Sequence, residues 1–298
     1  MHKTRLNAGM EGEVVDRNIN SRLGDAFLFS QSSLQDFVDC PRLFQLRHLE
    51  HLPWPAIESE PLLEFERHQH EGQVFHRLAH QALIGLPLNK IAPLVNTADL
   101  QKWWDQFCQH VLQSLKMQAD PTQVLYPEFT LSAPVRNHRL MAKFDLLVTA
   151  ADRLTIFDWK TNLKRPKDDW SAARLQTRVY RYMVVAAGDL LHAGRDFDPG
   201  QVEMIYWFTN FPEQPAHFPY SSAQFQRDRS SIESLIMEID SLCDFPRTED
   251  EKRCRYCPYR SFCERSVKVG NWKETVMDDL ALRADFDIDL EQIAEIEF

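Results

Sequence analysis

The amino-acid sequence predicts an α/β protein in which helices flank a mixed central sheet. Two observations support this prediction. Residues 122–161 contain three short runs rich in β-forming residues, and the segments on both sides have apolar residues at helical spacing. An order of helix, three strands, helix and strand is typical of a layered α/β domain. With 298 residues, of which 44% are hydrophobic and 26% charged, the chain can bury a sizeable core.

Helices are expected before the sheet. Residues 30–52 begin with serines suited to capping a helix, and Pro41 should break or restart that helix. Residues 70–85 predict an amphipathic helix that ends at Gly85, and residues 98–118 predict a longer helix with an apolar stripe.

The three β-rich runs are joined by short connections, so a three-stranded meander is the expected arrangement. They lie at residues 122–132, 138–150 and 153–161. A basic loop follows. After it we expect a helix from about Trp170 to Ala187, a buried strand at residues 201–210 and a last helix from about Ala223 to Leu242.

The net charge of −10 is unevenly distributed. Residues 271–298 carry nine acids and two bases, whereas residues 160–181 carry seven bases and two acids. A basic segment of this kind is compatible with binding phosphate groups, although a charge run is more often a solvated face. We expect a polar, mobile arm at residues 1–25, one domain at residues 26–268 and an acidic tail at residues 269–298.

Two further sequence patterns bear on the cellular location of the protein. No stretch reaches 18 uninterrupted apolar residues, and the first 25 residues lack the apolar core of a signal peptide, so no membrane association is expected. A cytoplasmic location is the default. In that reducing compartment the six cysteines are expected to be thiols or metal ligands rather than disulfides.

Carboxylates on neighbouring strands indicate metal-dependent chemistry. Asp145 interrupts an apolar strand, and Asp158 and Lys160 lie near the end of the next strand, on the face opposite Trp159. A meander can bring Asp145 beside Asp158, and a divalent cation would neutralise their repulsion. A lysine beside that ion could help to activate water or stabilise a phosphate, which suits phosphodiester hydrolysis. Taken alone, Asp-x-Lys is more often an exposed turn.

Three other elements carry candidate residues. Gln176 and Tyr180 are four residues apart and share a face of the helix after the meander. His76 lies on the helix before it, where a partly buried structural histidine is the commoner interpretation. Glu128, on the first strand, could reach a metal ion, but an exposed strand glutamate is the expectation.

These residues, in this order and with these intervening elements, resemble the PD-(D/E)XK nucleases of the RecB type. That group includes the AddB nuclease domain and CRISPR-associated exonucleases with an iron–sulfur cluster. The resemblance covers about residues 30–265 and implies a restriction-endonuclease-like core with an N-terminal helical part. Two positions depart from the pattern: Ala142 stands where the family often has glycine, and Asp158 stands where many members have glutamate.

The resemblance implies a role for each matching residue. His76, Asp145, Asp158 and the carbonyl of Trp159 would hold Mg²⁺ or Mn²⁺, and Lys160 would act with Asp145 and Asp158 in catalysis. Further residues would contact DNA or support the site, by the resemblance or because they belong to the basic run. They are Gln176, Tyr180, Lys164, Arg165 and Arg178.

Three cysteines, Cys254, Cys257 and Cys263, lie within ten residues of one another. A thiolate site for zinc or an iron–sulfur cluster usually takes four ligands. Cys40, in the run CPR, resembles the upstream cysteine of the iron–sulfur members, so a C-terminal clasp would tie the two ends of the domain together. Spacing alone fits a structural Zn²⁺ site and a [4Fe–4S] cluster equally, and the resemblance favours a structural [4Fe–4S] cluster.

The sequence therefore favours a metal-dependent DNA nuclease, in particular an exonuclease, in DNA repair or recombination or in CRISPR-type DNA processing. Its substrate would be single-stranded DNA or duplex ends, and a helicase or another repair or CRISPR protein could be its partner. The alternative from another class is a catalytically silent DNA-binding or assembly subunit that keeps the nuclease fold. A zinc-binding structural protein is a third, weaker hypothesis. The complete set of acids and lysine favours the enzyme.

Overall fold

The computed structural model describes most of the chain between residues 23 and 263. The described residues are 23, 27–52, 60–117, 122–150, 152–188, 191, 197–255 and 257–263. The acidic tail expected at residues 269–298 lies outside them, as does the arm expected at residues 1–25 apart from Leu23.

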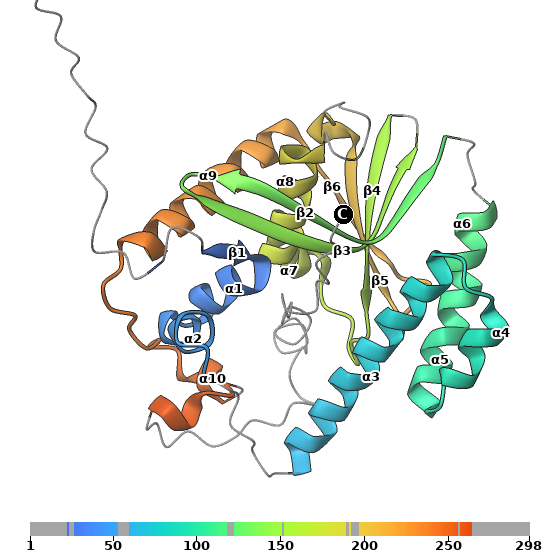
Figure 1. The fold of residues 1–298 in the computed structure, drawn as a ribbon, viewed down its shortest axis with the longest axis horizontal. Coiled ribbons are helices and arrows are strands. Elements are labelled where there is room, and N and C mark those ends of the chain that lie inside the picture. The colour runs from blue at the N-terminus through green and yellow to red at the C-terminus, as the bar shows by residue number, and fades with distance from the viewer. Residues whose placement is uncertain are drawn as a thin grey trace, which may run out of the picture.

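A six-stranded mixed sheet forms the centre of the molecule (Figure 1). Its strands are β1 (Leu28–Ser30), β2 (Val124–Val135), β3 (His138–Ala150), β4 (Arg153–Lys160), β5 (Val202–Phe208) and β6 (Ala216–Pro219). The predicted meander of β2, β3 and β4 is antiparallel, β5 runs parallel to β4, and β6 pairs antiparallel with β5. The predicted α/β fold with a mixed sheet is confirmed. The short strands β1 and β6 were not predicted.

Helices precede and follow the meander. Those before it are α1 (Gln31–Asp39), α2 (Pro41–Phe44), the π-helical turn η1 (Gln45–Leu49), α3 (Glu60–Leu83), α4 (Leu88–Ile91), η2 (Ala92–Leu94), α5 (Ala98–Gln106), η3 (Phe107–Leu112) and α6 (Gln113–Met117). Those after it are α7 (Asp168–Ala173), α8 (Leu175–Ala186), η5 (Pro199–Gln201), α9 (Ser222–Ser241), α10 (Glu251–Cys254) and η6 (Arg260–Cys263). Within the described ranges, no helix has the length and apolar character needed to cross a bilayer.

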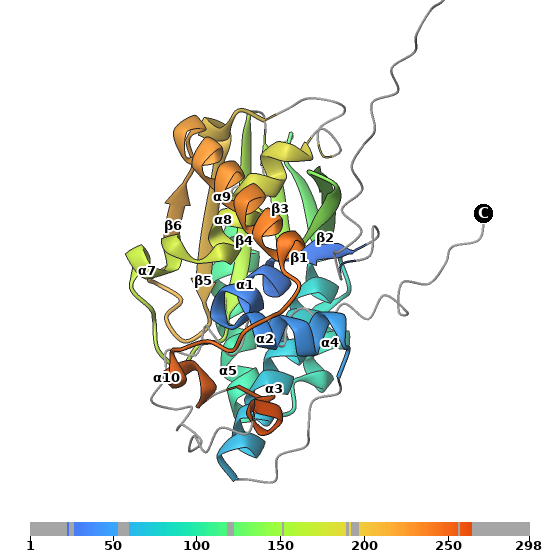
Figure 2. The same ribbon diagram turned by 90° about the vertical axis from the view of Figure 1, so that its left-hand side faces the viewer.

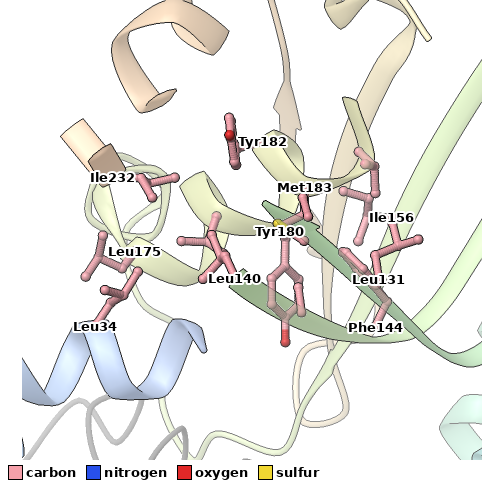
Figure 3. Close-up of a cluster of buried hydrophobic side chains, with 14 of the residues drawn as sticks. Leu34, Leu131, Leu140, Phe144, Ile156, Leu175, Tyr180, Tyr182, Met183 and Ile232 are labelled. Carbon is pink, nitrogen blue, oxygen red and sulfur yellow. The ribbon is translucent and has the colours of Figure 1, made fainter. Parts of the chain in front are cut away.

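Helices cover both faces of the sheet and bury two apolar cores. In Figure 1, α1, α8 and α9 lie on one side of the sheet, whereas α3 and α5 lie on the other; in Figure 2, α8 and α9 stand in front of the strands. The first core includes Leu34, Phe144 and Tyr180, shown in Figure 3. The second core contains Trp103 of α5 and Trp159 of β4. The functional residues described below lie between these two helical layers.

Local sequence explains where the helices begin and end. The Ser30 hydroxyl accepts a hydrogen bond from the Ser33 N–H at 3.1 Å, which caps α1. Cys40 is extended and Pro41 starts α2, so the predicted break at Pro41 is confirmed. The single helix predicted from Trp170 to Ala187 is divided into α7 and α8, because Arg174 has an extended backbone with ψ of 144°.

The edges of β3 are shared unequally among three strands. β2 pairs with β3 along its length, so β1 and β4 must share the other edge. β1 pairs with residues 139–141 and β4 with residues 146–150. Residues 142–145 therefore face an interruption in the ladder, and Asp145 stands at its margin.

The meander also changes face at this point. Phe144 and Leu146 would share a face in a regular strand, but Phe144 belongs to the core under α8 and Leu146 to the core under α3. Glu128 lies beside this change on β2 with a φ of 51°, in the left-handed region that a non-glycine residue seldom adopts. Such a conformation costs on the order of 1–2 kcal/mol, and such residues are concentrated at functional sites.

Candidate active site

Three carboxylates lie in one row across neighbouring strands. The β2–β3 register places Glu128 opposite Asp145, and continuing the β3–β4 register places Asp145 opposite Asp158. The β3–β4 ladder ends at the pair Leu146 and Phe157, so the row lies one step beyond its last pair. The expected approach of Asp145 to Asp158 thus follows from the register of the meander.

Both oxygens of Asp145 have partners. Its Oδ1 lies 3.0 Å from His76 Nδ1 on α3, and its Oδ2 accepts a hydrogen bond from the Trp159 N–H at 2.7 Å. α3 lies close to the residue that follows β4. A Cβ added at Gly72 would lie only 3.2 Å from Thr161 Oγ1. The glycine four residues before His76 is the sequence signal for this approach. Gly72 therefore helps to bring His76 within reach of Asp145.

Glu128 belongs to the site, and the expectation of an exposed strand glutamate is wrong. Its side chain is 19% exposed, and donor atoms of His76, Glu128 and Asp145 all lie within 4.8 Å of one another. The cross-strand position opposite Asp145 explains this placement. One imidazole nitrogen and two carboxylate oxygens suit a divalent cation such as Mg²⁺ or Mn²⁺, so the residues present fit the expected metal.

Asp158 and Lys160 form a closed group with Gln176 of α8. Lys160 Nζ lies 2.8 Å from Asp158 Oδ1 and donates to Gln176 Oε1 at 2.8 Å. The Gln176 amide donates to Asp158 Oδ2 at 2.7 Å. All three side chains are buried. Asp158, expected as a metal ligand, is therefore oriented toward Lys160 and Gln176, and Glu128 stands with His76 and Asp145.

The sequence analysis missed Tyr206. The β4–β5 register pairs Asp158 with Tyr206, so this residue continues the row of carboxylates. Its hydroxyl donates to Gln176 Oε1 at 3.3 Å and lies 2.7 Å from Thr177 Oγ1, and its ring centroid lies 4.7 Å from Lys160 Nζ. Only the pairing of β5 with β4 identifies it, because nothing local distinguishes it from other aromatic strand residues.

Tyr180 supports the same group from the core. It is 1% exposed, its ring centroid lies 4.8 Å from that of Phe144, and Figure 3 shows it pointing from α8 toward the sheet. Burial, followed by the negative charge of Asp158, raises the pKa of Tyr180 well above its ordinary value. It is therefore a protonated phenol near neutral pH, and it is hydrogen-bonded to Gln176.

Burial and neighbouring charges separate the pKa values of the three carboxyl groups. Burial raises the pKa of Asp158 to about 7; the Lys160 ammonium opposes this shift and Asp145 adds to it. Burial and then the charge of Asp145 raise the pKa of Glu128. Burial would also raise the pKa of Asp145, but the His76 charge and the hydrogen bonds from His76 and Trp159 outweigh it, so this pKa is lowered. Asp145 is thus the permanent anion of the row.

The basic run does not gather at the site as one surface. Arg178 Nε lies 2.6 Å from Asp228 Oδ1 of α9, and Arg165 lies 2.7 Å from Asp168. Lys164 is exposed, four residues after Lys160. Of the three residues predicted to bind DNA from this run, Lys164 is the one whose charge faces solvent.

Four cysteines from the two ends of the domain line one hollow: Cys40, Cys254, Cys257 and Cys263. The Thr248 N–H donates to Cys40 Sγ at 3.3 Å, and burial, followed by the charge of Cys40, raises the pKa of Cys263. Cys40 directly follows α1, whereas the other three cysteines lie after α9, so the hollow joins segments far apart in the sequence.

The sequence matches the profile of the PD-(D/E)XK nuclease superfamily over residues 28–264. The chain belongs to the PD-(D/E)XK nuclease superfamily. The resemblance found in the motifs is confirmed at this level, and the restriction-endonuclease-like core is the fold of that superfamily. Nuclease activity is accordingly the activity of this family, whereas the RecB-type subgroup stays a prediction.

Solved structures show similarity at low identity. A crystal structure from Eubacterium rectale named "Putative exonuclease" is 11% identical, with a TM-score of 0.48, and the alignment covers 91% of this chain and 98% of that one. The protein SSO0001 is 12% identical, with a TM-score of 0.36 and coverage of 81% and 87%. Similarity at this level carries no information on activity. No curated protein matches the sequence.

The raised pKa of Asp158 predicts a pH-dependent stability difference in metal-free protein. The folded state holds a proton on Asp158 that the unfolded state releases between pH 3.8 and about 7, so folding loses stability as pH rises through that window. The Asp158→Asn variant should therefore gain stability relative to wild type from pH 4 to about 7, and the difference should level off above.

Urea unfolding in the presence of a chelator measures this difference. The exposed Asp169→Asn variant is the matched control and should track wild type. A constant difference between Asp158→Asn and wild type across this pH range would contradict the assignment.

Proposed function

We propose that the protein is a DNA nuclease that hydrolyses phosphodiester bonds with Mg²⁺ or Mn²⁺. The observation that carries this proposal is the row of Glu128, Asp145 and Asp158 with Lys160 beside it and His76 within 3.0 Å of Asp145. Membership in the nuclease superfamily supports it. An acidic row alone is compatible with a structural site, but the buried lysine beside it adds the positive group that phosphodiester hydrolysis can use.

In this proposal His76, Glu128 and Asp145 hold the metal ion, and Asp158 and the Trp159 carbonyl are the further donors predicted from the sequence. A bound divalent cation would lower the pKa of a water and neutralise charge on the phosphate. Lys160 supplies the positive charge next to the scissile group, and Gln176 fixes the direction of its ammonium. Asp158 lies 2.8 Å from Lys160 Nζ and accepts a hydrogen bond from the Gln176 amide at 2.7 Å, so it also orients the lysine within the site.

The finer functional assignments belong to the same proposal. Exonuclease action on single-stranded DNA or duplex ends, a role in DNA repair or CRISPR-type processing, and a helicase or related partner rest on the RecB-type resemblance. A cytoplasmic location is the default that follows from the sequence patterns described above. Gln176 and Tyr180 support the site, and Lys164, Arg165 and Arg178 are the proposed DNA contacts. The alternative is a silent DNA-binding subunit that keeps the fold, and the intact Lys160–Asp158–Gln176 group favours the enzyme.

Cleavage of end-labelled DNA tests the proposal. With Mn²⁺, wild-type protein should degrade single-stranded or duplex DNA, and chelator should abolish the reaction. Lys160→Ala should lose at least about 100-fold in rate, on the scale of removing one preorganised electrostatic group. The matched control is Lys90→Ala, an exposed lysine on α4, which should retain the wild-type rate. Equal rates for wild type and Lys160→Ala, or DNA binding without any cleavage, would favour the silent subunit.

We also propose that the four cysteines hold a structural [4Fe–4S] cluster that joins the two ends of the domain. Two features support it: the four cysteines line one hollow, and the two ends of the domain pack around it. Tyr259 donates to the Leu52 carbonyl at 2.9 Å, the Arg42 N–H donates to the Pro246 carbonyl at 3.1 Å, and Arg253 forms an ion pair with Asp39. A cluster closing so long a loop would restrict the unfolded chain and stabilise the fold.

Protein purified without oxygen should absorb near roughly 400 nm and contain iron. Cys40→Ser should lose this absorbance and lower the unfolding temperature, because one cluster ligand is removed. Cys243→Ser, an exposed cysteine after α9, is the matched control and should keep both. A measured content of one zinc and no iron per chain would contradict the cluster and indicate a zinc site.

A further inference from the structure

A second lysine lies beside the row of carboxylates. Lys143 is on β3, two residues before Asp145, and it pairs with Thr130 of β2. Lys143 therefore lies beside Glu128 at the interruption in the ladder, next to the row of carboxylates.

The two lysines have different surroundings. Lys160 is buried and bonded to both Asp158 and Gln176. Lys143 is 42% exposed, and its Nζ lies 2.5 Å from Glu128 Oε2, the diagonal neighbour across the strands. The position of Lys143 on a paired strand fixes its backbone, so its ammonium can change partners without movement of the fold.

Glu128 has two competing uses. It is the ion-pair partner of Lys143, and it is one of the three residues whose donor atoms lie within 4.8 Å of one another. A carboxylate that coordinates a divalent cation has less negative charge left for an ammonium. An ion pair of a half-exposed lysine is weak, so a divalent cation would displace it readily.

We propose that Lys143 is a substrate-binding residue that Glu128 holds until the metal ion binds. Coordination of the cation by Glu128 releases the Lys143 ammonium, which then pairs with a backbone phosphate of the nucleic acid. This inference rests on the proposed metal-dependent nuclease function and adds the residue that couples metal binding to substrate binding. The ligand class is a phosphodiester strand, because the freed ammonium stands at the exposed side of the row.

The proposal predicts effects of opposite sign in the Lys143→Met variant. Mn²⁺ should bind about two- to fivefold more tightly, because the competitor for Glu128 is gone, a range that corresponds to a half-exposed ion pair. DNA should bind more weakly in the presence of Mn²⁺, and the slope of log affinity against log salt should become shallower by about one. Lys143→Arg should restore the salt slope.

Mn²⁺ binding is measured from the electron paramagnetic resonance signal of the free ion, without DNA. DNA binding is measured in a Lys160→Ala background, so that the strand is not cut. Lys90→Met is the control and should match wild type in both assays. In Glu128→Gln, Mn²⁺ affinity should fall, and DNA affinity without metal should rise toward the level that the wild type reaches with metal.

The outcomes separate this inference from the proposed function. If wild-type protein binds no Mn²⁺, the metal-dependent nuclease proposal fails. If wild type binds Mn²⁺ and Lys143→Met has the same Mn²⁺ affinity and the same salt slope, the nuclease proposal stands and the role of Lys143 is overturned. Weaker binding of both ligands by Lys143→Met would also overturn it, because that is the result of simple misfolding.

Discussion

The interruption on one edge of β3 is the constraint on which the site depends. β1 and β4 share that edge and leave residues 142–145 between them. Asp145 therefore lacks a ladder partner there, and its carboxylate takes the Trp159 N–H at 2.7 Å instead. The same register aligns Glu128 and Asp158 with it.

Electrostatics then assigns different properties to chemically similar groups. The carboxylates repel one another in a partly buried row. Each is compensated by different side chains: Asp145 by His76 of α3, Asp158 by Lys160 and Gln176, and Glu128 by Lys143. The pKa of Asp145 is lowered, whereas burial raises that of Asp158. A divalent cation would satisfy this row more completely than the surrounding side chains do.

Much of this arrangement could be predicted from the sequence, because the hydrophobic periodicity and the order of the motifs along the chain were strong signals. The meander, Asp145, the Asp158–Lys160 pair and the face shared by Gln176 and Tyr180 are local patterns. Tyr206 was missed, and Glu128 was considered but expected to be exposed, because the positions of both depend on cross-strand register, which no local pattern encodes. Arg178 was proposed as a DNA contact from its charge, and its ion pair with Asp228 could not be foreseen because it depends on the packing of α9. The short strands β1 and β6 have too few residues to show a period.

A crystal structure of the protein with Mn²⁺ would test the central claim most directly, because anomalous scattering locates the ion independently of any activity. One anomalous peak is expected within bonding distance of Glu128, Asp145 and His76, beside the end of the β3–β4 ladder. The absence of a peak in the row at saturating Mn²⁺, with His76 still bonded to Asp145 and Lys143 still bonded to Glu128, would contradict it.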